Sequence, residues 1–127
     1  VGKHMFARGK GGKIINIASQ MAVVGYVYRA HYCAAKAGVA NLTRVLAYEW
    51  AKHGIKVNAV GPTFVKTPFT APFFEDKAFY NDVISRIPLG RLAETQDITG
   101  TIVFLASSAS DFITGQTILV DGGWTAI

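Results

Sequence analysis

Tyr32 and Lys36 are the residues of this sequence best placed for acid–base chemistry. They are four positions apart, so on a helix their side chains emerge on one face. A phenol ordinarily stays protonated well above neutral pH, and a neighbouring ammonium favours its ionised form. Such a pair can exchange a proton with a substrate oxygen. The spacing also arises by chance, and the alternative is a solvated lysine above a half-buried tyrosine.

Ser19 adds a hydroxyl group where parallel α/β folds bind ligands. It directly follows residues 13–18, an apolar run typical of a strand buried on both faces. Ligands in such folds bind outside the carboxyl ends of the strands. Ser19 is therefore a candidate for holding a substrate oxygen beside Tyr32. The alternative is a loop serine that caps its own backbone.

These side chains must be positioned by strands and helices that alternate along the chain. A long helix is predicted over about residues 30–53, because apolar residues recur at helical spacing and Gly54 gives the usual C-terminal signal. Further strands are predicted over residues 55–60 and 117–120. The predicted apolar stripe of the long helix comprises Val39, Leu42, Val45, Leu46 and Trp50.

A second helix is predicted to end near Ala106, with Thr95 or Asp97 as its cap. Its apolar stripe comprises Ile98, Ile102, Val103 and Leu105. Strands that alternate with helices indicate an α/β fold, in which crossover helices connect parallel strands. Three strands leave an open sheet edge, so we expect the chain to begin partway through a larger fold.

Composition and charge narrow the class of protein. The 127 residues are 50% hydrophobic and 17% charged, as in a globular domain. No apolar run is long enough for a membrane span, and no signal peptide is expected. The single cysteine, Cys33, fits a reducing compartment, so a cytoplasmic location is expected. The net charge is +5, but no nucleic-acid motif accompanies it, and we expect no nucleic-acid partner.

Several segments together resemble the short-chain dehydrogenase/reductase family. Residues 16–19, Asn-Ile-Ala-Ser, followed by residues 32–38, Tyr-Cys-Ala-Ala-Lys-Ala-Gly, are similar to the active-site segment of that family. Residues 54–60 resemble its next strand. Pro62 with Thr67 resembles its Pro-Gly loop, although Thr63 stands where the family often has glycine. The C-terminal signatures are matched by residues 88–91 and 120–123.

This resemblance implies a fold and a set of roles. The fold would be a Rossmann-type doubly wound parallel sheet, represented by its C-terminal half only, with residues 1–127 as one partial domain. Ser19 would polarise the substrate oxygen, Tyr32 would be the acid–base, and Lys36 would favour the tyrosinate and bind the nicotinamide ribose. The substrate would be a small carbonyl or alcohol, the cofactor NAD or NADP, and no metal is expected. The implied cofactor-binding residues are Tyr32, Lys36, Pro62, Thr63, Val65 and Thr67.

Finer resemblances concern the substrate and the quaternary structure. Residues 61–68 and 122–126 resemble the sugar- and polyol-oxidising branch, which includes gluconate 5-dehydrogenase-like enzymes, and a 3-oxoacyl carrier-protein reductase-like substrate is the alternative. Residues 70–80 would form a substrate lid. Helices 30–53 and 97–106 would associate in a homodimer or homotetramer. The aromatic residues Phe69, Phe73, Phe74 and Phe79 could line a pocket or fill a core.

The family's glycine-rich turn for the cofactor pyrophosphate has no counterpart here. Gly9, Gly11 and Gly12 precede a strand, so they cannot place a helix N-terminus at a phosphate. We therefore expect the isolated chain to bind cofactor poorly and to turn over little. The alternative to a piece of an active enzyme is an inactive half-domain that serves as a binding or assembly unit.

Overall fold

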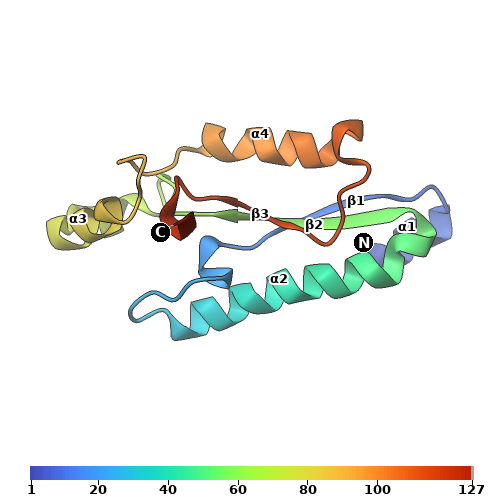
Figure 1. Cartoon of the computed structure of the whole chain (residues 1–127), viewed down its shortest axis with the longest axis horizontal. Coiled ribbons are helices and arrows are strands. Elements are labelled where there is room, and N and C mark those ends of the chain that lie inside the picture. The colour runs from blue at the N-terminus through green and yellow to red at the C-terminus, as the bar shows by residue number, and fades with distance from the viewer. Residues whose placement is uncertain (127) are drawn as a thin grey trace.

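The computed structural model describes residues 1–126 and contains a parallel sheet between two layers of helix (Figure 1). The strands lie in chain order across the sheet, and they are β1 (Gly12–Ile17), β2 (Ile55–Pro62) and β3 (Thr117–Val120). The helix α2 (Ala30–Trp50) covers one face, and α4 (Thr95–Ala106) covers the other (Figure 1). The predicted α/β fold with crossover helices is therefore confirmed.

Two smaller helices lie at opposite ends of the sheet. α1 (Gly2–Arg8) lies beside the amino ends of the strands, and α3 (Lys77–Ser85) lies beyond their carboxyl ends (Figure 1). The remaining helical segments are short 3-10 turns, at Gln20–Ala22, Ala51–His53, Ala71–Glu75, Ser108–Ser110 and Trp124–Ala126. No helix among residues 1–126 combines the length and apolar character that crossing a bilayer requires.

The chain changes sheet face between β2 and β3. Strand order advances in one direction from β1 to β3, yet α2 and α4 lie on opposite faces. The two crossovers therefore have opposite hands, although right-handed crossovers are the strong rule in parallel sheets. The change of face takes place after β2, so the chain passes the carboxyl ends of the strands on its way to α4.

Burial differs between the central and the outer strand. Ile55, Val57 and Val60 of β2 are each at most 1% exposed. Ile17 of β1 is 51% exposed, because β1 pairs with β2 along one edge only. β1 is the edge strand of the described sheet and is half-buried. Its Ile14 packs against the cluster that contains Ala47 of α2, and its Ile15 packs against the cluster that contains Leu105 of α4, so both faces of the strand predicted over residues 13–18 are covered.

Part of each predicted apolar stripe points away from the sheet. The buried residues of α2 are Ala40, Thr43 and Ala47, whereas Leu42 and Val45 are 50% and 44% exposed. Small residues on the sheet side let the helix approach closely, and helical spacing alone does not tell which of two stripes is buried. Val103 of α4 is likewise exposed, while Ile98 and Leu105 are buried as predicted.

The N-terminus of α4 is capped by Glu94, and not by Thr95 or Asp97 as predicted. Glu94 and Asp97 form a capping box. The Glu94 side chain accepts the backbone N–H of Asp97, and the Asp97 side chain accepts the backbone N–H of Glu94. Arg91 holds Asp97 through two hydrogen bonds of 2.6 and 2.9 Å. The bonds from Arg91 and from the Glu94 N–H keep the pKa of Asp97 well below its usual range.

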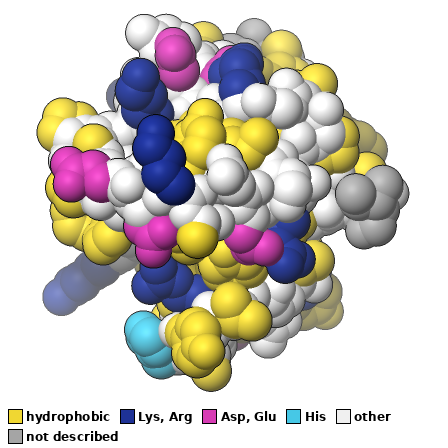
Figure 2. All heavy atoms as spheres, turned by 90° about the vertical axis from the view of Figure 1, so that its left-hand side faces the viewer, with side chains coloured by type: hydrophobic (Ala, Val, Ile, Leu, Met, Phe, Trp, Pro, Cys, Tyr) yellow, Lys and Arg dark blue, Asp and Glu magenta, His cyan; other side chains and the backbone are white. Residues whose placement is uncertain are grey.

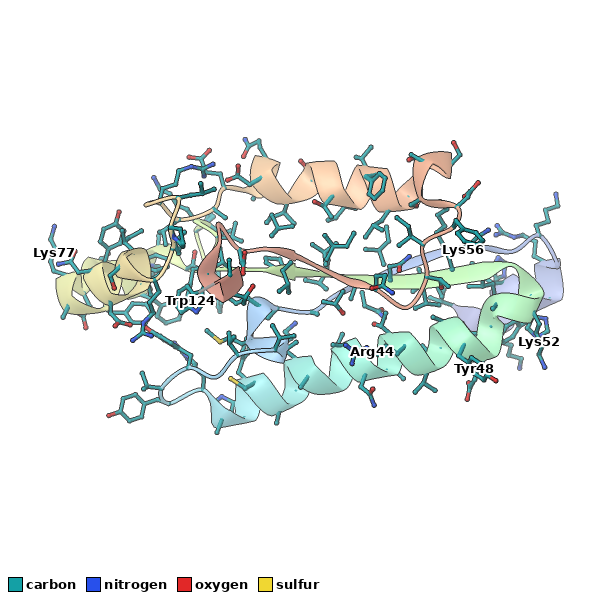
Figure 3. The ribbon with its side chains drawn as sticks, viewed as in Figure 1. Arg44, Tyr48, Lys52, Lys56, Lys77 and Trp124 are labelled. Atoms are coloured by element: carbon teal, nitrogen blue, oxygen red, sulfur yellow. The ribbon has the colours of Figure 1, made fainter. Side chains whose placement is uncertain are left out.

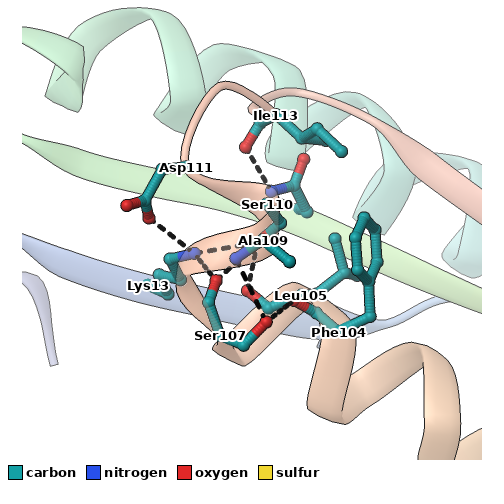
Figure 4. A network of polar contacts seen from close by, with 9 residues as sticks. Lys13, Phe104, Leu105, Ser107, Ala109, Ser110, Asp111 and Ile113 are labelled. Carbon is teal, nitrogen blue, oxygen red and sulfur yellow. Dashed lines mark hydrogen bonds and ion pairs between the residues drawn. The ribbon is translucent and has the colours of Figure 1, made fainter.

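Lys13 connects the start of β1 to the turn that follows α4 (Figure 4). Its Nζ donates to the Ser107 carbonyl and, at 2.8 Å, to the Ser110 hydroxyl. It also pairs with Asp111 at 2.9 Å, which lowers the pKa of that carboxyl group. A half-buried ammonium with three partners fixes the end of the α4 layer against the sheet edge.

Candidate active site

A pocket of about 450 Å³ lies at the carboxyl ends of β1 and β2. Parallel α/β sheets bind ligands at this edge. Every site residue expected from the sequence lines this pocket, namely Ser19, Tyr32, Lys36, Pro62, Thr63, Val65 and Thr67. Segments separated by long stretches of chain therefore meet at one place, as a shared site requires.

Ser19 is held at the end of β1 with its hydroxyl proton unused. The residue is 6% exposed, and its Oγ accepts the Met21 N–H at 3.1 Å. The structure thus shows the local cap that was the alternative interpretation of this serine. An Oγ that accepts one bond can still donate its own proton, so capping leaves Ser19 able to bind a substrate oxygen.

Tyr32 and Lys36 lie on the first two turns of α2. The Lys36 Nζ is 5.7 Å from the centre of the Tyr32 ring. It also donates to the Ile17 carbonyl at 2.9 Å, which anchors the ammonium to the end of β1. Lys36 is therefore positioned beside the phenol and does not simply extend into solvent.

The loop after β2 is fixed by backbone and threonine hydrogen bonds. The Thr63 N–H donates to the Val120 carbonyl at 3.1 Å. The Thr70 hydroxyl donates to the Val65 carbonyl at 2.6 Å and accepts the Thr67 N–H at 2.9 Å. The Thr63 Oγ1 is buried, and none of the described residues offers it a hydrogen-bond partner. The loop is rigid, yet it retains an unused polar atom beside the pocket.

The phenylalanines that follow β2 both line the pocket and fill a core. Phe69 and Phe73 are 80% and 49% exposed, with rings edge to face at 5.9 Å. Phe74 and Phe79 stack at 5.8 Å and belong to a hydrophobic cluster with Trp124, which Figure 3 labels. We call the pocket-lining phenylalanines the aromatic wall, which comprises Phe64, Phe69, Phe73, Phe74 and Phe79.

Another part of the pocket lining is polar and includes residues that sequence reasoning missed. Arg29 precedes Tyr32 by three positions, and Gln20 follows Ser19. The position of Arg29, three residues before Tyr32, was the available signal for the arginine. Gln20 is 1% exposed, and its amide has no hydrogen-bond partner within residues 1–126. We call this part of the lining the polar wall, which comprises Ser19, Gln20, Arg29, Tyr32 and Lys36.

A polar contact joins the segment before α2 to α3. The Tyr26 hydroxyl donates to Asp82 at 2.7 Å, and Arg86 holds the same carboxylate through two bonds of 3.0 Å. Burial and then the Asp82 bond raise the pKa of Tyr26 to about 12. The bonds from Arg86 and Tyr26 lower the pKa of Asp82. This joint holds the segment before α2, which leads to Arg29 and Tyr32, against α3, which carries Phe79.

The charges that line the pocket are all positive. Arg29 and Lys36 are its charged residues, and no carboxylate lies among its lining residues in the described chain. Seen from this end, the surface around the pocket mixes hydrophobic side chains with lysines, arginines and acidic residues, so the positive charge is a property of the pocket lining and not of the whole face (Figure 2). Across residues 1–126, no cluster of His, Cys, Asp and Glu could hold a metal ion. The pocket thus combines a tyrosine–lysine pair, a serine hydroxyl, an apolar surface and the positive charges of Arg29 and Lys36.

The chain belongs to the short-chain dehydrogenase/reductase family. The family described as enoyl-(acyl carrier protein) reductase matches residues 1–125.

Among curated relatives, the chain is 49% identical to 2-dehydro-3-deoxy-D-gluconate 5-dehydrogenase of Escherichia coli, over 98% of the chain and 49% of the relative. It is 38% identical to gluconate 5-dehydrogenase of Gluconobacter oxydans, over 98% of the chain and 48% of the relative. The chain therefore spans about half the length of the curated relatives it matches.

Solved structures agree with this assignment. A gluconate 5-dehydrogenase from Burkholderia cenocepacia in complex with NADP and tartrate superposes with a TM-score of 0.94 and 40% identity, over 100% of this chain and 49% of that one. A putative 2-deoxy-D-gluconate 3-dehydrogenase from Agrobacterium tumefaciens with bound NADP gives 0.95 and 44%, over 99% and 51%. The fold of the described residues is thus that of the corresponding half of these dehydrogenases.

Proposed function

We propose that the protein carrying this chain interconverts a secondary alcohol and a carbonyl group on a sugar acid, using NAD or NADP. The observation that carries the proposal is the meeting of Ser19, Tyr32 and Lys36 in one pocket. Relatives at 38–49% identity that are named as dehydrogenases of gluconate and its derivatives support the substrate class. The positive pocket supports an anionic substrate.

The pocket residues fit the nicotinamide end of the cofactor. Thr63 offers a buried hydroxyl without a partner in the described part of the chain. The Val65 carbonyl already accepts the Thr70 hydroxyl, so we expect the Val65 N–H to bind the carboxamide. Thr67 would add a side-chain contact, and Lys36 with Tyr32 would bind the ribose. When bound, the nicotinamide supplies or accepts the hydride.

The pyrophosphate would need residues other than those described. Gly11 and Gly12 lie at the amino end of β1, at the far end of the sheet from the pocket. No glycine-rich turn from a strand to a helix lies beside the pocket in residues 1–126. The proposal therefore applies to the whole protein.

The three polar side chains would handle the proton. In the reductive direction the Tyr32 hydroxyl donates its proton to the carbonyl oxygen, and in the oxidative direction the phenolate removes it from the alcohol. The Lys36 ammonium stabilises the phenolate. The Ser19 hydroxyl donates a hydrogen bond to the same substrate oxygen, which lowers the energy of the alkoxide-like transition state.

The test compares Tyr32→Phe with Tyr48→Phe in the protein expressed from its native gene. Both tyrosines lie on α2, but Tyr48 is 89% exposed and distant from the pocket (Figure 3). With D-gluconate and NAD or NADP, we expect Tyr32→Phe to reduce kcat by about 1,000-fold, as the loss of a general acid–base does. Tyr48→Phe should retain the wild-type rate, measured by the absorbance of the reduced cofactor.

Two results would contradict the proposal. One is a Tyr32→Phe variant that stays within a few-fold of the wild-type rate. The other is a folded wild-type protein that neither oxidises the substrate nor melts at a higher temperature with NAD or NADP, since a ligand bound by the native state must stabilise it. The second result would favour the inactive binding or assembly unit.

We also propose that copies of the protein associate through α2 and α4 as a homodimer or homotetramer. Leu42 and Val45 on α2 and Val103 on α4 are large apolar side chains left exposed by the sheet packing. Exposed apolar faces of this kind mark association surfaces. Sedimentation at two protein concentrations would test the proposal, and a monomer at both would contradict it.

A further inference from the structure

The geometry points to Arg29 as the residue that binds the carboxylate of the substrate, an inference that rests on the proposed function. Arg29 lines the same pocket as Tyr32 and Lys36. Tyr32 and Lys36 share one face of α2, and Arg29 is the N-cap three positions before Tyr32, so the three pocket-lining residues lie close together in the chain at the start of this helix. A substrate that binds there can contact all three.

Arg29 is the positive charge in the pocket that has no other assignment. The Lys36 ammonium is bonded to the Ile17 carbonyl and lies beside the Tyr32 ring. Ion pairs in the described residues involve Lys13, Arg86 and Arg91, and none involves Arg29. A planar guanidinium binds a carboxylate through two parallel hydrogen bonds, which gives both affinity and orientation.

The position of Arg29 opposes the usual rules of helix capping. It is the N-cap residue of a 21-residue helix, and its side chain makes no capping hydrogen bond. N-caps are normally Ser, Thr, Asp or Asn, and a positive charge at this end is repelled by the helix dipole. The first turn of α2 also contains no acidic residue. A bound carboxylate would neutralise the arginine and would itself be stabilised by the helix N-terminus.

A short sugar acid can contact Tyr32 and Arg29 at the same time, because both residues line one pocket at the start of α2. In a gluconate skeleton oxidised at C5, the carboxylate carbon and the reacting carbon are four bonds apart, or about 5 Å. Arg29, at the N-cap, and Tyr32, in the first turn of α2, both line the same pocket. A substrate with its C5 oxygen at Tyr32 can therefore place its C1 carboxylate at Arg29. The same arrangement gives no advantage to a polyol with a neutral C1 group.

The experiment uses two substrates that differ only at C1, D-gluconate and D-sorbitol. Wild type, Arg29→Gln and Arg29→Lys are compared in the protein expressed from its native gene. Arg44→Gln is the matched control, because Arg44 lies further along α2 and does not line the pocket (Figure 3). KM and kcat are measured with both substrates. The shift in melting temperature caused by D-gluconate is measured in saturating NADP.

We expect Arg29→Gln to raise KM for D-gluconate by about 30-fold with kcat nearly unchanged, as for the loss of one charged contact made in both ground and transition states. D-Sorbitol kinetics should change by less than about 3-fold. Arg29→Lys should be intermediate, and Arg44→Gln should match wild type. The melting shift with D-gluconate should shrink in Arg29→Gln only.

The outcomes separate this inference from the proposed function. Equal changes with both substrates, or no change with either, would overturn the role of Arg29 while leaving the dehydrogenase intact. A folded wild type that oxidises neither substrate and does not melt at a higher temperature with NAD or NADP would refute the proposed function. In that case the inference is tested by the change in melting temperature that D-gluconate causes. No change in wild type, or an equal change in wild type and Arg29→Gln, would also overturn the inference.

Discussion

The two walls of the pocket differ in what they contribute to the stability of the fold. On the polar wall, Gln20 buries an amide without a hydrogen-bond partner among the described residues, which opposes folding. Arg29 places a positive charge at a helix N-terminus. Between them, Tyr28 holds a φ of 58°, a left-handed conformation that disfavours residues with a Cβ. These features are unfavourable for folding.

The aromatic wall shows the opposite pattern. Its rings pack edge to face and stacked, as Phe64 does with Phe74 and Phe79. Asp76 caps α3 by accepting two backbone N–H groups at 2.9 and 3.2 Å. The polar groups of the preceding loop are largely bonded to one another. This wall therefore stabilises the site that the polar wall strains.

The polar side chains and the stabilising contacts of the pocket are therefore divided between two segments of the chain. Residues that break local rules tend to be functional, and their cost is offset elsewhere in the fold. Here the stabilising contacts that offset this cost belong to the aromatic wall of the same pocket. Substitutions on the aromatic wall should mainly change stability, and those on the polar wall should mainly change chemistry or relieve strain.

The largest expected effect on stability is that of Phe74→Ala. Phe74 is half-buried among Phe64, Phe79 and Tyr80. Its removal should lower the free energy of unfolding by about 2 kcal/mol, less than for a fully buried ring. Phe69→Ala is the matched variant, because Phe69 is 80% exposed, and its effect should stay within about 0.5 kcal/mol. Urea unfolding measures both, and equal losses would contradict the division between core and surface rings.

Tyr26→Phe should have a smaller effect, because it removes the hydrogen bond that joins the segment before α2 to α3. The expected loss is about 1 kcal/mol near neutral pH. Burial and the Asp82 bond raise the pKa of Tyr26 from 10.0 to about 12. The stability linked to this proton is therefore complete below about pH 10 and is lost as the pH rises towards 12.

Urea unfolding at pH values from about 8 to about 11 measures this contribution, because the series starts below the pKa of the unfolded tyrosine and extends into the range in which the stability is lost. Wild type should lose stability in the alkaline range more steeply than Tyr26→Phe. Tyr48→Phe is the control, since Tyr48 is 89% exposed, and it should follow wild type. Parallel curves for wild type and Tyr26→Phe would show that the joint does not stabilise the fold.

An effect no larger than that of Tyr26→Phe is expected from relieving strain at Tyr28. Its side chain is 97% exposed, so truncation removes little packing. Because glycine adopts a positive φ freely, Tyr28→Gly should be more stable than Tyr28→Ala by about 1 kcal/mol. Thermal unfolding of the two variants gives the difference. An alanine variant as stable as the glycine variant would show that this turn is unstrained.

The order of elements could be predicted because it follows from local signals. Gly54 marks the end of the long helical segment and adopts the left-handed conformation expected of a C-terminal glycine. The apolar run before Ser19 predicted β1 to within a residue at each end. Tyr32 and Lys36 could be paired because four positions on a helix fix their relation.

The packing of segments that are far apart in the chain could not be predicted from the sequence. Leu42 and Val45 have the same helical spacing as the residues that do face the sheet, so only the packed structure distinguishes the two stripes. That Phe74 is a core ring and Phe69 a surface ring depends on where α3 lies. Gln20 and Arg29 became candidates only when the loop after β2 completed the pocket around them.

The change of sheet face after β2 has a consequence for how this architecture can diversify. The connection from β1 to α2 and the longer connection from β2 to α4 both leave the carboxyl ends of the strands and line the pocket there. The segment between β2 and α4 consists of a loop, a 3-10 turn and α3 (Figure 1). Residues of this segment line the pocket together with Ser19, Tyr32 and Lys36. Insertions in this segment would alter the shape of the pocket without changing the register of the strands. The same frame can therefore accommodate substrates of different length.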